Sequence, residues 1–152
     1  MSEPKPKLLF LAYAFPPRNA AGSVRLWNIA KHLARLGWDV TVVAIDPSLM
    51  RNPESPERVT DLLAQEGVRR LVTGHKWRCL SPKGLKCWDQ NLGWFAGGVC
   101  RTIARNLGID NSVGWVKAAE QACSSLTPKD VDIILASGSP FVAFRLAKKL
   151  SD

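Results

Sequence analysis

An alternation of apolar runs and one amphipathic stretch between Lys7 and Ile45 constrains the fold more than any other feature of the sequence. The run Lys7–Ala12 is continuously apolar after its first residue, as expected of a strand buried on both faces. An amphipathic stretch follows, with Ser23 as its expected N-cap and Gly37 at its end. The run Asp39–Ile45 is rich in β-branched residues, which favour strands. Strand, helix and strand in this order predict a right-handed βαβ unit with parallel strands.

The remainder of the chain continues the alternation, with a less regular middle. Thr73–Asn91 shows no clear period. The other expected elements are, in chain order, a helix from Ser55-Pro56 to Gly67, a strand at Val68–Val72, helices from about Gly93 to Leu107 and from about Ser112 to Leu126, a strand at Asp132–Ala136, and a final helix that starts at Ser139-Pro140. We therefore predict one α/β domain over residues 1–152, a Rossmann-like three-layer sandwich with a mostly parallel sheet.

Length and composition agree with one globular domain. The chain has 152 residues, of which 46% are hydrophobic and 22% charged. The apolar run near the N-terminus is short and lacks a small-residue cleavage site, so we expect a cytoplasmic protein without a signal peptide. The formal net charge of +8 favours anionic partners. The alternative is a charge that serves solubility alone.

The cysteines do not form a recognisable metal or redox motif. Cys79, Cys87, Cys100 and Cys123 include no Cys-x-x-Cys pair. His75 lies near two of them, but the spacing matches no common zinc pattern. We expect reduced, free cysteines, no bound metal and no cofactor.

Two loops stand where an α/β protein binds its ligands, at the carboxyl ends of strands. These are Tyr13–Gly22 and Ser137–Pro140, and each leads into the amino end of a helix, which favours an anion. Neither loop carries the Gly-x-Gly-x-x-Gly fingerprint or a phosphate loop ending in Gly-Lys-Ser/Thr. The sequence thus argues against a dehydrogenase and against a P-loop NTPase.

The first loop and its surroundings resemble a known family. The segment Leu8–Pro17, which ends in Phe-Pro-Pro, and the following Ala21–Arg25 resemble the opening of family 4 glycosyltransferases of the GT-B fold, the glycosyl transferase 4-like N-terminal domain. Leu36–Val43 and Asp132–Pro140 are similar to later parts of the same domain. The resemblance covers most of the chain and is weak from about Asp46 to Asn106.

Two positions depart from the family pattern. Ala21 stands where the family has its first loop glycine. Ser137-Gly138-Ser139 stands where many members carry a catalytic histidine, so no catalytic base is transferred to this chain. His75, which follows an expected strand, is the one weak candidate for a catalytic residue.

The resemblance implies metal-independent transfer of a sugar from a nucleotide sugar to a glycan or a lipid-linked acceptor. It implies that the chain is the acceptor-side half of the enzyme, that the donor-binding C-terminal domain is absent, and that this half is inactive alone. The candidates for approaching the donor phosphates are Ala21, Gly22, Ser23 and Arg25. The acceptor-side candidates are Phe15, Arg18, Ser137, Gly138 and Ser139.

Aromatic and basic residues in the irregular middle suggest contact with an anionic membrane. Trp94, Phe95, Arg101 and Arg105 combine interfacial aromatics with cations, which suits peripheral binding at the inner membrane. The alternative is that these aromatics complete the core or pack on the absent domain. Two further interpretations of the whole chain stay open: a stand-alone nucleotide-binding Rossmann module, and a non-catalytic docking module for a membrane or a protein partner. We expect no nucleic-acid partner.

Overall fold

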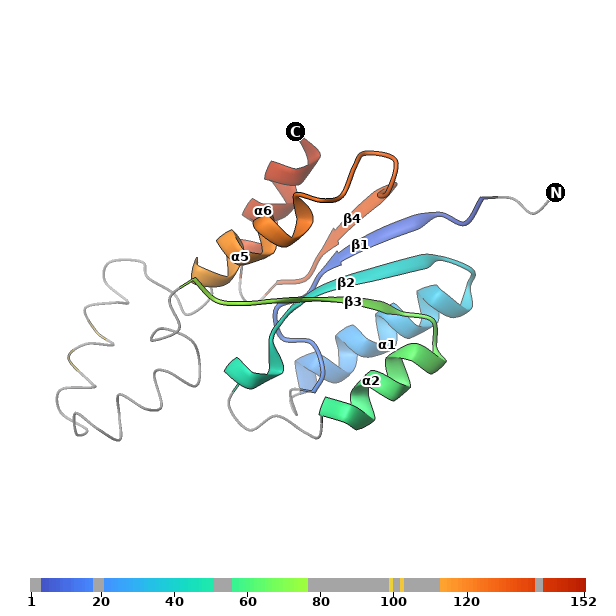
Figure 1. Ribbon diagram of the computed structural model, residues 1–152, viewed down its shortest axis with the longest axis horizontal. Helices are drawn as coiled ribbons and strands as arrows, with labels where there is room; N and C mark the ends of the chain where they lie inside the picture. Colours follow the sequence, from blue (N-terminus) through green and yellow to red (C-terminus); the bar gives the residue numbers. More distant parts are fainter. Residues whose placement is uncertain are drawn as a thin grey trace.

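The computed structural model describes residues 4–17, 21–50, 56–76, 99, 102, 113–138 and 141–152. These residues form a four-stranded sheet, in which all the pairings are parallel and the strand order is β3-β2-β1-β4 (Figure 1). The strands are β1 (Lys7–Leu11), β2 (Asp39–Ile45), β3 (Arg69–Thr73) and β4 (Ile133–Ala136). The helices are α1 (Ala21–Arg35), the 3-10 helix η1 (Pro47–Leu49), α2 (Pro56–Gln65), α5 (Val113–Cys123) and α6 (Val142–Ser151). The predicted Rossmann-like α/β fold is confirmed.

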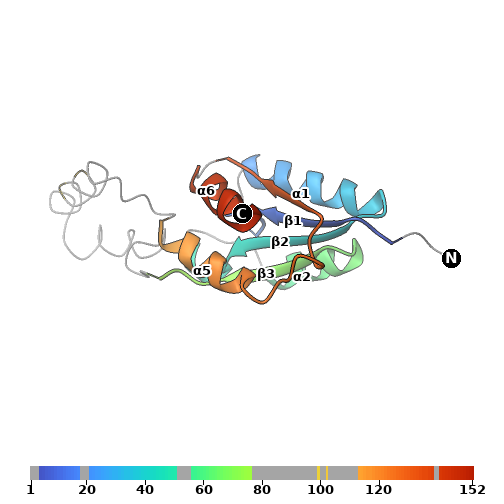
Figure 2. The ribbon, with the colours of Figure 1, turned by 90° about the horizontal axis from the view of Figure 1, so that it is seen from above.

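Helices cover both faces of the sheet and make a three-layer arrangement (Figures 1 and 2). α1 and α2 lie on one face, where Leu26, Ala30 and Leu63 join a core cluster with inward side chains of β1 and β2. α5 and α6 lie on the other face, where Trp115 and Leu146 join a second cluster. Because β1 and β2 are buried on both faces, their sequences are apolar almost throughout.

The carboxyl ends of all four strands meet at one edge of the sheet. Leu11 is in register with Val43 and with Ala136, and Ile45 is in register with Thr73. Backbone hydrogen bonds extend this pairing beyond the strands, from the amide of Ala12 to Val43, of Asp46 to Thr73 and of Ser137 to Leu11. We call this the carboxyl edge, and the loops that leave it are the ones that the topology offers to a ligand.

Most expected elements are present, and two helix starts differ from the prediction. β2 has the predicted bounds, and Gly37 and Gly67 follow α1 and α2 with φ of 91° and 69°, which glycine adopts without strain. α1 begins at Ala21, two residues before the expected N-cap. α6 begins at Val142 with Phe141 in the N-cap position, so Ser139-Pro140 does not start it.

Part of the predicted structure cannot be compared. The helix expected from Gly93 to Leu107 lies outside the described residues, apart from Val99 and Thr102, which are helical. Among the described residues, no helix has the length and apolar character that crossing a bilayer requires.

Candidate functional site

The loop that follows β1 turns its largest side chains into the protein. Phe15 is completely buried and packs edge-to-face against Trp27 of α1, with ring centroids 6.3 Å apart. It belongs to the core cluster between the sheet and the α1–α2 layer. This placement does not favour a contact between the Phe15 ring and an acceptor, because the ring has no exposed surface.

Ser23 is also buried, and it anchors the loop. Its hydroxyl donates a 2.7 Å hydrogen bond to the carbonyl oxygen of Ala14, and none of the residue is exposed. The prediction that Ser23 caps α1 is wrong, since it is the third residue of the helix. The same bond does not favour a phosphate contact through the Ser23 side chain, because the hydroxyl points back into the loop.

The backbone at the start of α1 is what this loop leaves accessible. Ala21 and Gly22 are exposed, and a Cβ added to Gly22 would meet no atom within 4 Å. The first amide groups of a helix have no partner within it, and the helix dipole adds a partial positive charge there. The amino end of α1 is thus a candidate position for an anion at the carboxyl edge.

Arg25 lies on the exposed surface of the same helix. It lines a shallow, open depression that runs along the outer face of α1. The residues lining it are Ala21, Val24, Arg25, Asn28, Ile29, His32 and Leu33. The depression brings Arg25 and Ala21 to one surface, and His32 is exposed on it.

The loop after β4 leaves the sheet beside the loop after β1, because the two strands are neighbours. Ser137 and Gly138 are half-buried there. A Cβ on Gly138 would lie 3.4 to 3.5 Å from the rings of Phe141 and Phe144, which stack on each other with centroids 6.2 Å apart. Phe141 is 76% exposed. Gly138 therefore lies directly against two exposed aromatic rings.

His75 occupies a packing position. It is buried just beyond β3, and its ring fills the space beside Gly114 of α5, where an added Cβ would come within 2.3 Å of the ring Cε1. Nearby on the same side of the sheet, Tyr13 packs edge-to-face on the buried Trp115 at 5.3 Å. The candidate role of His75 in catalysis is not favoured by this placement, because a buried ring against a helix is not presented to a ligand.

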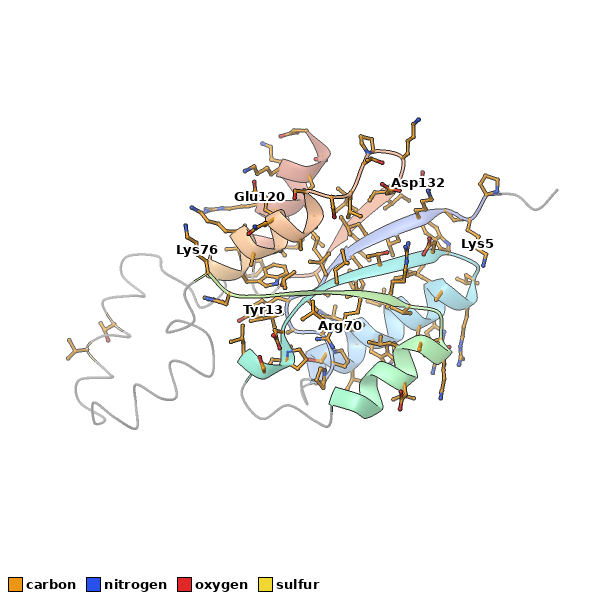
Figure 3. All side chains as sticks on the ribbon, in the orientation of Figure 1. Lys5, Tyr13, Arg70, Lys76, Glu120 and Asp132 are labelled. Atoms are coloured by element: carbon orange, nitrogen blue, oxygen red, sulfur yellow. The ribbon has the colours of Figure 1, made fainter. Side chains whose placement is uncertain are left out.

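Arg70 is a polar side chain at the carboxyl edge that sequence reasoning missed. It lies on β3 opposite Val42, and its Nη2 donates a 3.1 Å hydrogen bond to the carbonyl oxygen of Ile45, the last residue of β2 (Figure 3). Its place inside an expected strand is the one feature of the sequence that could have drawn attention to it. Beside Arg69, however, a second arginine is typical of a solvent-facing position.

Several predicted residues cannot be placed. Arg18, Ser139, Trp94, Phe95, Arg101 and Arg105 lie outside the described residues, as do Cys79, Cys87 and Cys100. The described Cys123 is free and buried in the core beside α6, and burial raises the pKa of its thiol to about 11. In the part of the chain that the structure describes, no three His, Cys, Asp or Glu side chains are grouped so that they could hold a metal ion.

Comparison of the chain with models of protein families, with curated proteins and with solved structures finds no match. Its function is therefore inferred from the fold, the carboxyl edge and the residue pattern of the first loop.

Proposed function

We propose that this chain is the acceptor-side domain of a GT-B glycosyltransferase, which transfers a sugar from a nucleotide sugar to a glycan or lipid-linked acceptor. The proposal joins the Phe15-Pro16-Pro17 to Arg25 motif, which resembles family 4 enzymes, to a Rossmann-like domain. It assigns the chain binding and positioning of substrates, and no transfer of sugar when this domain is alone.

The exposed first residues of α1, Ala21 and Gly22, are the observation that carries the proposal. Ser23 ties the helix to the loop through Ala14, and Phe15 is buried beneath the helix. Ala21 and Gly22, the first two residues of the helix, are exposed. A loop held in this way presents backbone amide donors in a fixed position. Fixed donors stabilise charge because they need not reorganise when the charge develops.

The chemistry follows from that arrangement. Breaking the bond between a sugar and a nucleotide diphosphate leaves negative charge on the departing phosphate. Amide groups and the dipole at the amino end of α1 stabilise such charge without a metal ion. The adjacent Ser137 and Gly138, with the exposed rings of Phe141 and Phe144, offer a surface for an acceptor beside it. No general base is assigned.

Ligand-observed NMR with a panel of compounds tests the proposal. The panel contains neutral oligosaccharides, UDP-glucose, GDP-mannose, NAD and ATP. We expect oligosaccharide binding and weak binding of both nucleotide sugars, with no release of UDP or GDP. Tight binding of NAD or ATP without any sugar binding would instead favour a stand-alone nucleotide-binding module.

A backbone variant links the binding to α1. Gly22→Pro removes one amide donor in the first helical turn, where proline is tolerated. It should weaken binding of both nucleotide sugars and leave the melting temperature close to that of the wild type. Gly74→Pro, outside the helix and beyond β3, serves as a control for the introduction of proline. Unchanged nucleotide-sugar affinity in Gly22→Pro would contradict the proposed role of α1.

A further inference from the structure

Arg70 is the most unusual charged residue among those described. Its register partner, Val42, belongs to the core on the α1–α2 side, so Arg70 projects to that side and is half-buried there. Its Nη2 has the carbonyl of Ile45 as a partner, at 3.1 Å. Its Nε is buried and has no hydrogen-bond partner within the described structure.

No carboxylate neutralises this guanidinium in the described residues. Asp46 is the acidic group whose charge acts on it, yet the two form no ion pair, and the Asp46 carboxylate instead accepts the amide of Ser48 at 2.7 Å. Burial lowers the pKa of Arg70 from its ordinary value, against the opposing effect of Asp46. The neighbouring Arg69 behaves in the usual way: it is 63% exposed and pairs with Asp39 at 2.8 Å.

A guanidinium that has no carboxylate partner among the described residues is costly to withdraw from water, because it loses hydration that a carbonyl oxygen only partly replaces. Ionisable side chains in perturbed surroundings cluster at functional sites, where an anionic ligand can act as the partner of an arginine. The location supports this explanation. The contact with Ile45 places the guanidinium at the carboxyl edge, where α/β proteins bind ligands.

We propose that Arg70 binds the anionic group of a ligand, a phosphate or a carboxylate, at the carboxyl ends of β2 and β3. The planar guanidinium presents paired donors that match either group. Arg70 belongs to β3, whereas the helix whose amino end carries the proposed function follows β1. The inference goes beyond the proposed function, since it does not require that the ligand be a sugar donor or acceptor.

Anion binding by matched arginine variants tests the assignment. Binding of pyrophosphate and of citrate is measured by calorimetry at constant ionic strength, for the wild type, Arg70→Met and Arg69→Met. We expect Arg70→Met to weaken binding of at least one anion by about ten-fold, the effect of losing one charged hydrogen bond. Arg69→Met should bind as the wild type does. Equal losses in both variants, or no loss in Arg70→Met, would overturn the proposal.

The two probes also separate the possible sources of the anion. Preference for pyrophosphate indicates a phosphorylated ligand, and preference for citrate indicates a carboxylate. In the wild type, the NMR signal of the Arg70 Nε–H should shift on titration with the preferred anion. The shift should persist in Gly22→Pro, so that failure of the α1 site and failure of the Arg70 site give different results. An Nε–H signal unmoved at saturating anion would contradict the assignment.

Stability without any anion distinguishes binding from a structural role. If the role of Arg70 is to bind a ligand, Arg70→Met removes a partly buried charge, and its free energy of unfolding in urea should equal or exceed that of the wild type. A clear loss of stability in Arg70→Met would mean that the arginine holds the fold together through Ile45, and would overturn the proposal.

Discussion

The Ser23 hydroxyl donates a 2.7 Å hydrogen bond to the carbonyl oxygen of Ala14, joining the first helix to the loop that precedes it. The bond spans nine residues and is shielded from solvent, since Ser23 has no exposed surface. It sets where α1 begins relative to β1, and thereby which backbone amides are open at the carboxyl edge.

Loss of this bond should destabilise the protein. Ser23→Ala leaves the Ala14 carbonyl without its donor, and we expect the free energy of unfolding in urea to fall by about 1 to 2 kcal/mol. Ser124→Ala is the matched control, because that hydroxyl also bonds to a main-chain carbonyl, that of Gln121, but at an exposed position. Equal effects of the two substitutions would show that the buried bond has no special role.

Gly114 should be intolerant of a side chain. Gly114→Ala places a methyl group within 2.3 Å of the His75 ring, so the ring or the helix must move, at a cost of about 1 to 3 kcal/mol. Gly22→Ala is the control, since it is likewise the second residue of a helix and has open space around it. Urea unfolding measures both variants. A Gly114→Ala protein as stable as Gly22→Ala would contradict the packing of His75.

The same contact predicts a rescue. His75→Ala removes the ring that the methyl group would meet, so Gly114→Ala should cost less in that background than in the wild type. The double-mutant cycle reports the coupling of the two residues. An unchanged cost would place the steric conflict elsewhere.

Part of the stability that the protein loses in acid should come from Glu66. Its carboxylate accepts hydrogen bonds from Arg35 at 2.7 and 2.5 Å, with Lys31 at 3.8 Å. The bond from Arg35, with the positive charges around it, lowers the pKa of Glu66 from its ordinary value of 4.5. This contribution to stability is present above pH 4.5 and is lost as pH falls through the lowered pKa.

Glu66→Gln is the variant that isolates this effect. Its free energy of unfolding should lie below that of the wild type at pH 7, and the difference should shrink at acidic pH and in high salt. Urea unfolding of both proteins, repeated across a range of pH and of salt concentration, measures this difference in free energy. A difference that stays constant with pH would mean that Glu66 acts through packing and not through charge.

Cys123 should react slowly and should make the fold sensitive to alkali. Burial raises the pKa of its thiol from 9.0 to about 11, so little thiolate exists at pH 8. A variant that retains only Cys123 should react with a disulfide reagent much faster in urea than in buffer. Its stability should be complete below pH 9 and decline as pH rises toward 11, and this decline should be absent in Cys123→Ala. Fast native-state labelling would contradict the burial.

Periodicity predicted the sheet better than the site. Asp39–Ile45 is predicted as a strand because β-branched residues dominate it and Gly37 ends the preceding helix. By contrast, Ser23 has the appearance of an N-cap, but a tertiary bond to Ala14 decides its place. Phe15 in a loop motif looks accessible, and only the packing of α1 buries it. The environment of Arg70 depends on strand register and on the carbonyl of Ile45, which no local pattern encodes.

The most direct test of the account is to map where a bound ligand acts, by recording ¹H–¹⁵N spectra of the chain during titration with UDP-glucose or with the oligosaccharide that binds. We predict that the largest shifts fall on the amides of Ala21, Gly22, Ser137 and Gly138, at the carboxyl edge. Shifts concentrated at the opposite edge of the sheet, around Asp39 and Asp132, or no shifts with any sugar ligand, would contradict the account.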